Sequence, residues 1–206
     1  MHKKTSNIAI IILAAGASKR MQTSKQLLKW GDSTLLGCTI ETALKLKIEN
    51  TYVVLGANYQ LIGESISKFN IAILNNENWE SGLGNSIAFA VNHILKSNNK
   101  TDAILFMLAD QPFIDEHFLN ELINQFKADN DNIIATSYGK DKYGVPVIFD
   151  KIYFKALSKL NDDNGAKHLL KQHKSKVETL IPPVKNVDLD FMEDYIKLHN
   201  YKLKNP

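Results

Sequence analysis

The segment after the first apolar run combines residue types that could bind a phosphate. Small residues at Ala14, Ala15, Gly16 and Ser18 let the backbone approach a phosphate closely, and successive amides there can form an anion-binding nest. Arg20 and Lys25 add positive charge from the same loop. The loop lacks both the Gly-Lys-Ser/Thr of a Walker A sequence and the G-x-G-x-x-G fingerprint, so P-loop hydrolysis and dinucleotide redox chemistry are both disfavoured. A purely structural turn of small residues is also compatible with this pattern.

Two acidic segments could hold a metal ion. Asp110 comes just after a long apolar run and lies next to Gln111-Pro112, in the position where α/β proteins bind ligands. Mg²⁺ prefers one or two carboxylates together with substrate phosphates, so Asp110 could begin a metal site, although it could instead cap the following turn. Asp188 and Asp190 alternate in an extended segment, which would place both carboxylates on one face. Burying that pair is costly unless a cation lies between them.

The elements that must position these residues follow from the hydrophobic pattern. Near-continuous apolar runs at residues 8–13, 52–55, 71–74 and 103–108 are typical of strands buried on both faces of a parallel sheet. Helices are expected at 34–47 with Ser33 as the N-cap, at 87–95, and after Asp115. This alternation predicts a three-layer α/β/α fold of the Rossmann-like, doubly wound type, with its active face at the carboxyl ends of the strands.

The pattern changes after about residue 130. Residues 133–137 and 144–149 are expected to form a hairpin, which would add an antiparallel element in the C-terminal half of a mostly parallel sheet. A short helix around Leu169 and Leu170, a strand at 177–181 and a closing helix at 193–199 should follow. Because no linker or repeat interrupts the sequence, we expect residues 1–206 to form a single domain.

Composition and charge exclude several classes of protein. With 206 residues, 44% hydrophobic and 23% charged, the chain is close to the globular average, which argues against disorder and coiled coil. The lone Cys38 excludes a disulfide framework within one chain and fits a reducing compartment. The net charge is only +3 and the basic residues are dispersed, so nucleic-acid binding is not expected. The longest apolar stretch, residues 8–15, is far short of the ~20 residues that span a bilayer. We therefore expect no membrane segment and a cytoplasmic location.

Taken together, these segments resemble the MobA-like nucleotidyltransferases, and within that family the molybdenum-cofactor cytidylyltransferases. The family opens with Leu-Ala-Ala-Gly-x-Ser-x-Arg-Met-Gly-x-x-Lys-Gln-Leu-Leu, and residues 13–28 match this pattern except at Gln22, where the family has glycine. Further matches follow in the same order along nearly the whole chain: Asn76 to Trp79 with Gly82 and Ser86, then Asp110-Gln111-Pro112, Tyr138-Gly139 with Gly144-Val145-Pro146, Asp163-Asn164-Gly165-Ala166-Lys167, and Asp188-Leu189-Asp190. Phe191-Met192 replaces the family's usual Thr-Pro.

The resemblance implies a Rossmann-like nucleotidyltransferase fold and a Mg²⁺-dependent enzyme. Its reaction would transfer CMP from CTP to a molybdopterin-type cofactor and release pyrophosphate, and a molybdenum hydroxylase could then receive the product. The implied catalytic residues are Arg20, Lys25 and Asp110. Asp110, helped by Asp190 or Asp188, would bind Mg²⁺. The implied nucleotide-binding residues are Leu13, Ala14, Ala15, Gly16, Ser18, Asn76, Gly82 and Ser86.

The acceptor and the donor base remain open at this point. In the family, Leu-Ala-Ala-Gly goes with cytidine and Leu-Ala-Gly-Gly with guanosine, so Ala15 favours CTP over GTP. A sugar phosphate or polyol phosphate is an alternative acceptor. A non-catalytic protein that delivers the cofactor to molybdenum hydroxylases is a further alternative, which the changes at Gln22 and Phe191-Met192 leave open. Trp79 is expected to pack rather than to stack on a base, and Tyr143, Gly144 and Pro146 could shape the acceptor pocket.

Overall fold

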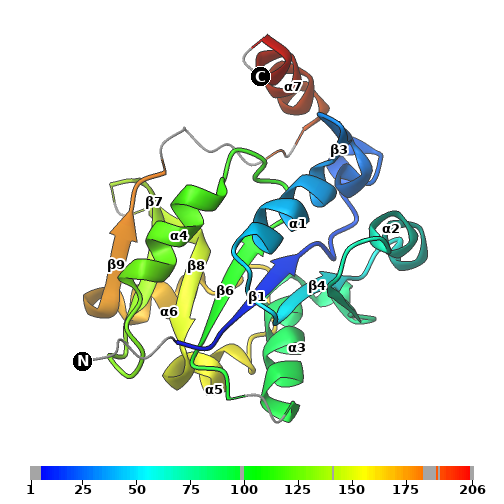
Figure 1. The fold of residues 1–206 in the computed structure, drawn as a ribbon. Helices are drawn as coiled ribbons and strands as arrows, with labels where there is room; N and C mark the ends of the chain where they lie inside the picture. Colours follow the sequence, from blue (N-terminus) through cyan, green and yellow to red (C-terminus); the bar gives the residue numbers. More distant parts are fainter. Residues whose placement is uncertain (1–5, 98–99, 141, 183–188, 190, 205–206) are drawn as a thin grey trace.

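The protein is built on one seven-stranded sheet (Figure 1). The computed structural model describes residues 6–97, 100–140, 142–182, 189 and 191–204. In sheet order the strands are β5 (Ala72–Asn75), β4 (Thr51–Leu55), β1 (Ile8–Leu13), β6 (Ala103–Leu108), β8 (Lys142–Asp150), β7 (Ile133–Gly139) and β9 (Val177–Leu180). A separate small hairpin pairs β2 (Lys29–Trp30) with β3 (Ser33–Thr34).

The direction of the strands confirms the predicted sheet. β1 pairs in parallel with both β4 and β6, and β5 continues the parallel arrangement at one side. β8 runs antiparallel to both β6 and β7, which makes the predicted hairpin the antiparallel element of the C-terminal half. β9 then pairs in parallel with β7.

Helices cover both faces of the sheet because alternate strand residues point to opposite sides. In β1, Ile10 and Ile12 belong to one core cluster, with side chains of α1 (Leu35–Lys45), α2 (Tyr59–Ile66) and α4 (Glu116–Gln125). Ile11 and Leu13 belong to the other cluster, with α3 (Leu83–Lys96), α5 (Phe154–Leu157) and α6 (Lys167–Gln172). This is the predicted three-layer α/β/α fold.

At the helix starts, one N-cap was predicted correctly and one was not. Asp115 caps α4 as predicted, since its carboxylate accepts a hydrogen bond from the Phe118 amide at 2.8 Å. The predicted cap of α1 was wrong by one residue: Thr34 accepts from the Gly37 amide at 3.0 Å, whereas Ser33 belongs to β3 and donates its hydroxyl to Glu41. The pairing of β3 with β2 moves the helix start by one residue, and that pairing was not predicted.

The closing helix α7 (Met192–Lys204) is longer than predicted and lies beside the β2–β3 hairpin rather than on the sheet (Figure 1).

Helix α2 was not predicted. Its start at Asn58 carries no side-chain cap, and only Ile62 and Ile66 of its residues are buried, so its sequence signal is weak. Within the described residues, no helix has the combination of length and apolar character needed to cross a membrane.

Candidate active site

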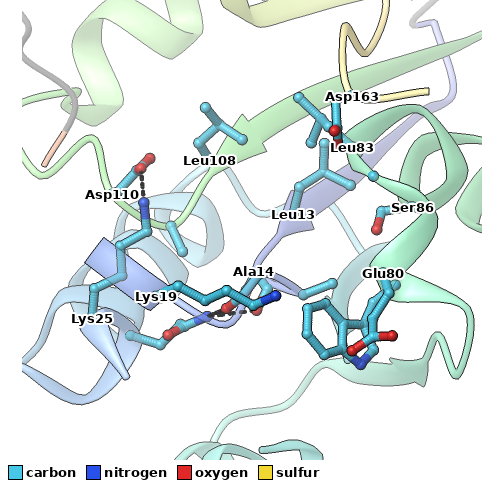
Figure 2. A pocket seen from close by; sticks show the side chains of 16 residues that line it. Leu13, Ala14, Lys19, Lys25, Glu80, Leu83, Ser86, Leu108, Asp110 and Asp163 are labelled. Atoms are coloured by element: carbon cyan, nitrogen blue, oxygen red, sulfur yellow. Dashed lines mark hydrogen bonds and ion pairs between the residues drawn. The ribbon is translucent and has the colours of Figure 1, made fainter. Parts of the chain in front are cut away.

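A pocket of about 320 Å³ opens where β1 and β6 end, which is the edge of the sheet at which the sequence placed the ligand (Figure 2). Its walls come from the loops after these two strands, the start of α3 and a loop near residue 163. The lining residues are Leu13, Ala14, Ala15, Gly16, Lys19, Lys25, Gln26, Trp79, Glu80, Gly82, Leu83, Ser86, Leu108, Ala109, Asp110 and Asp163.

The loop after β1 is held in shape by residues that follow it in the chain. Gln26 is buried, and its side-chain amide donates to the carbonyl oxygens of Ala14 and Gly16, both at 2.8 Å. The Ser18 hydroxyl accepts a hydrogen bond from the Lys25 amide at 3.2 Å. At Gly16 an added Cβ would meet no atom within 4 Å, so the space beside this backbone is open to a ligand. Gln26 lies in the matched motif, but no role was predicted for it.

Lys25 and Asp110 form an ion pair at one end of the pocket, drawn as a dashed line in Figure 2. The side chain of Asp110 is 9% exposed and that of Lys25 is 21% exposed. The Lys25 ammonium also lies 3.5 Å from the Leu189 carbonyl oxygen, to which it donates. Two of the three predicted catalytic residues are therefore in direct contact, although they are 85 positions apart in the sequence.

The third predicted catalytic residue, Arg20, lies elsewhere. Its guanidinium is 5.3 Å from the centre of the Phe191 ring, and among the described residues the loop contributes Lys19, not Arg20, to the pocket lining. Residues 19–21 form a short 3₁₀ turn, in which consecutive side chains point in different directions because the turn has about three residues per revolution. Lys19, like Gln26, is therefore a pocket residue for which the sequence predicted no role.

The other end of the pocket depends on glycine at position 82. Gly82 has φ +98°, and an added Cβ would collide with the Asp163 carboxylate and come within 2.8 Å of the Asp162 carbonyl oxygen. The Gly84 amide donates to the same carbonyl at 2.7 Å. These contacts fix the loop around residue 163 against the start of α3, and they bring the Asp163 carboxylate into the pocket (Figure 2). Asp163 belongs to one of the matched motifs, but no role was predicted for it.

Asn76 lies behind the pocket wall and does not line it. It is 1% exposed, and its side-chain amide donates to the Ser86 hydroxyl and to Asn85, both at 3.1 Å. The side-chain oxygen Oδ1 of Asn76 accepts a hydrogen bond from the Asn78 backbone amide at 3.1 Å. Ser86 itself is 3% exposed and does line the pocket. The predicted nucleotide-binding residue Asn76 therefore acts on the pocket through Ser86.

The predicted site residues thus divide into those that line the pocket, those that lie near it, and those outside the described residues. Those that line the pocket are Leu13, Ala14, Ala15, Gly16, Lys25, Gly82, Ser86 and Asp110. Ser18, Arg20 and Asn76 are close to it in the chain but are not among the lining residues. Asp188 and Asp190 lie outside the residues that the structure describes. Trp79 both packs and lines the pocket: an added Cβ at Gly56 would come within 2.8 Å of its Cδ1 atom.

The expected acceptor-shaping residues lie away from this lining. Tyr143, Gly144 and Pro146 are in β8 and are not among the pocket residues. The neighbouring Val145 carbonyl instead accepts from Gln111, whose side-chain nitrogen lies 3.3 Å away, and from the Tyr138 hydroxyl. The hairpin therefore contacts the segment next to Asp110 through Gln111.

Gln22 is the one departure from the opening motif, and its backbone shows why glycine suits this position. Its backbone is left-handed, with φ 56° and ψ 13°, and this region favours glycine because a Cβ is strained there. The loop in this protein keeps a conformation suited to the family's glycine, although it carries glutamine at that position.

The comparisons with known proteins agree with this geometry. Residues 10–177 match the MobA-like NTP transferase domain. The nicotine blue oxidoreductase of Paenarthrobacter nicotinovorans is 29% identical over 174 residues, which cover 79% of this chain and 80% of that protein. The purine catabolism protein PucB of Bacillus subtilis is 26% identical over 171 residues, with 78% and 79% covered. The bifunctional protein GlmU of Ruthia magnifica is 29% identical over 195 residues, and the chain spans only 41% of its length.

Solved structures extend the likeness to the whole fold. Rv0371c of Mycobacterium tuberculosis H37Rv superposes with a TM-score of 0.82 at 26% identity, covering 96% of this chain and 99% of that one. A nucleotidyl transferase of Methanothermobacter reaches the same TM-score of 0.82 at 17% identity, with 97% and 99% covered, which shows a shared fold. Since the domain match runs from residue 10 to residue 177 and includes every residue that lines the pocket, the chain belongs to the MobA-like family of nucleotidyltransferases.

Proposed function

We propose that this protein transfers CMP from CTP to a molybdopterin-type cofactor and releases pyrophosphate. The observation that carries the proposal is the set of charged side chains gathered in one pocket. Lys19 and Lys25 supply positive charge, Asp110 pairs with Lys25, and Glu80 and Asp163 contribute further carboxylates around the start of α3 (Figure 2). A triphosphate is strongly anionic, so the lysines attract it and these two carboxylates repel it.

The two lysines and the open backbone at Gly16 set the proposed orientation of the donor nucleotide. The triphosphate would lie along the open backbone at Gly16, near Lys19 and Lys25, and the nucleoside would lie toward Ser86 and Trp79. At the nucleoside end, carboxylates can accept hydrogen bonds from ribose hydroxyls and from an exocyclic amino group. Cytosine carries such an amino group. Adenine and guanine carry an amino group as well. The choice of cytosine therefore rests on Ala15, which the family pattern associates with cytidine.

The reaction needs positioning and charge stabilisation rather than a general base. A phosphate monoester has its second pKa near ~6, so the acceptor phosphate is already ionised at neutral pH. One of its oxygens forms a bond to the α-phosphorus, and the bond from that phosphorus to the bridging oxygen breaks. The electron pair leaves with pyrophosphate. Lys25 would stabilise the charge that develops on the phosphoryl oxygens, and Lys19 would hold the leaving phosphates.

Asp110 suits a Mg²⁺ ion that is shared with the substrate. Its carboxylate is nearly buried and faces the pocket, and Mg²⁺ is commonly held by one or two carboxylates plus substrate phosphates. In the described part of the chain, no group of three or more His, Cys, Asp or Glu side chains could hold a metal by itself. When bound, the ion would neutralise charge on the phosphates. Asp188 and Asp190 remain candidates for a second carboxylate ligand.

A pyrophosphate-release assay tests the proposal. Purified protein is incubated with Mg²⁺, a molybdopterin-type cofactor and each of CTP, GTP, ATP and UTP in turn, and Asp110→Asn serves as the inactive control. We expect release with CTP. Release with another triphosphate would keep the transfer reaction and reject the choice of base. Release only when a sugar phosphate or polyol phosphate replaces the cofactor would reject the acceptor. Nucleotide binding without any release would support the delivery-protein alternative.

A further inference from the structure

Trp30 joins the segments that bear Lys25 and Asp110 to the C-terminal helix α7. Its side chain is buried, with 1% exposed, and lies beyond the pocket lining. The Phe113 ring meets it edge-on, at 5.6 Å between ring centres and an angle of 87°. Tyr195 and His199 of α7 lie 6.4 Å and 5.9 Å from it. Trp30, Phe113, Tyr195 and His199 are called the aromatic hub below.

Each member of the hub is close in sequence to a group at the pocket. Trp30 ends the segment that contains Lys25, and Phe113 follows Asp110 after two intervening residues. Tyr195 and His199 lie in the helix that follows Leu189, whose carbonyl oxygen accepts a hydrogen bond from the Lys25 ammonium. The segments that follow the two partners of the ion pair and the C-terminal segment therefore meet in one packed cluster.

The C-terminal segment makes further contacts with the segment that bears Lys25. The Tyr195 hydroxyl donates to the Lys29 carbonyl oxygen at 2.8 Å. Phe191 packs under the Arg20 guanidinium, and the buried Leu189 belongs to the same small apolar cluster as Trp30. A polar bond, a cation–π contact and apolar packing thus hold one segment against the other.

We propose that Leu189 together with residues 191–199 forms a positioning arm for the catalytic pair, with Tyr195 as its main positioning residue. A lysine side chain is long and flexible, and a displacement of about 1 Å can cost ~10²-fold in rate. The arm restrains the backbone around Lys25 from one side, and Phe113 restrains the segment after Asp110 from the other. As far as it concerns catalysis, this inference rests on the function proposed above.

The kinetic test compares neighbouring residues on α7. Tyr195→Ala removes the ring and the bond to Lys29, Tyr195→Phe removes the bond alone, and Ile196→Ala is the matched control because Ile196 is 52% exposed. We expect Tyr195→Ala to lower kcat for pyrophosphate release by ~10-fold or more, in line with the cost of misplacing a catalytic group. The KM for CTP and the preference among bases should change little. Tyr195→Phe should retain intermediate activity, and Ile196→Ala should match the wild type.

A second measurement does not depend on activity. Hydrogen exchange is compared in the wild type, Tyr195→Phe, Tyr195→Ala and Ile196→Ala, at a temperature below every unfolding midpoint. In the Tyr195 variants only, we expect faster exchange both in α7 and in peptides that cover residues 19–30 and 110–115. Faster exchange confined to α7, or an unchanged kcat in Tyr195→Ala, would overturn the proposal. If the wild type itself shows no turnover, the proposed function fails, and the exchange data still decide whether the arm exists. If Tyr195→Ala does not fold, the same comparison is made with Tyr195→Phe.

Discussion

Replacing Lys25 and Asp110 singly and together should separate their roles in stability and in catalysis. The variants are Lys25→Met, Asp110→Asn and the double variant, which keep the side-chain sizes close to those of the native residues. The ion pair is partly buried, with side chains 21% and 9% exposed. Each single change therefore leaves the remaining side chain of the pair largely buried and without the opposite charge that compensates it.

The expected magnitudes lie between two limits. Exposed ion pairs contribute about 0.2–1 kcal/mol, and removing one partner of a fully buried pair costs about 3–5 kcal/mol. Lys25 can move toward the open pocket and keeps the Leu189 carbonyl as an acceptor, so we expect each single change to cost ~1–3 kcal/mol. The double variant should be less destabilised than the sum of the single changes, with a coupling energy of ~1–2 kcal/mol.

Urea unfolding of the four proteins measures the coupling, and pyrophosphate release measures catalysis. The double variant should remain folded and inactive, and it should lose less stability than the sum of the two single changes. Lys25→Met alone should lower the rate by on the order of 10²-fold or more, as expected for the loss of one preorganised charge-stabilising group. A coupling energy below ~0.5 kcal/mol would show that the ion pair does not stabilise the fold. Rates within a factor of about three of the wild type in Asp110→Asn would remove Asp110 from the reaction.

Three further substitutions test particular parts of the structure. Gly82→Ala should weaken CTP binding, measured by calorimetry, and destabilise the protein by ~1–3 kcal/mol, because the added Cβ forces the Asp163 loop away from α3; unchanged binding would contradict the role of this loop. Gln22→Gly should raise the unfolding midpoint, measured by calorimetry, because it relieves a left-handed backbone at φ 56°; a lower midpoint would mean that the entropy of glycine outweighs the strain. Burial, followed by the nearby Asp131 and Asp150 carboxylates, raises the pKa of Tyr153. Folding therefore favours the neutral phenol, and this contribution to stability is complete below the ordinary pKa of ~10 and is lost as the pH rises through the higher folded-state pKa. Urea unfolding across that range should show a smaller alkaline loss of stability in Tyr153→Phe.

Local pattern was enough to predict the main elements. The apolar runs at Ile8–Leu13 and Ala103–Leu108 appear as strands with the expected bounds, because residues buried on both faces leave a continuous signal. Asp115 as a cap and the hairpin of β7 and β8 were also predictable, since both depend on neighbouring residues. The position of the pocket followed from the strands alone, because ligands bind at the carboxyl ends of parallel strands.

Eight of the predicted site residues line the pocket, but local pattern could not decide the direction of every side chain near it. Arg20 and Lys19 are adjacent and both positively charged, and only the turn between Ser18 and Gln22 directs Lys19 inward. Asn76 was expected to bind nucleotide, but it is buried behind Ser86. Asp163 reaches the pocket because its loop packs on glycines far away in the sequence. The types and spacing of residues are properties of the sequence, whereas the direction of a side chain depends on backbone angles and on packing against distant segments.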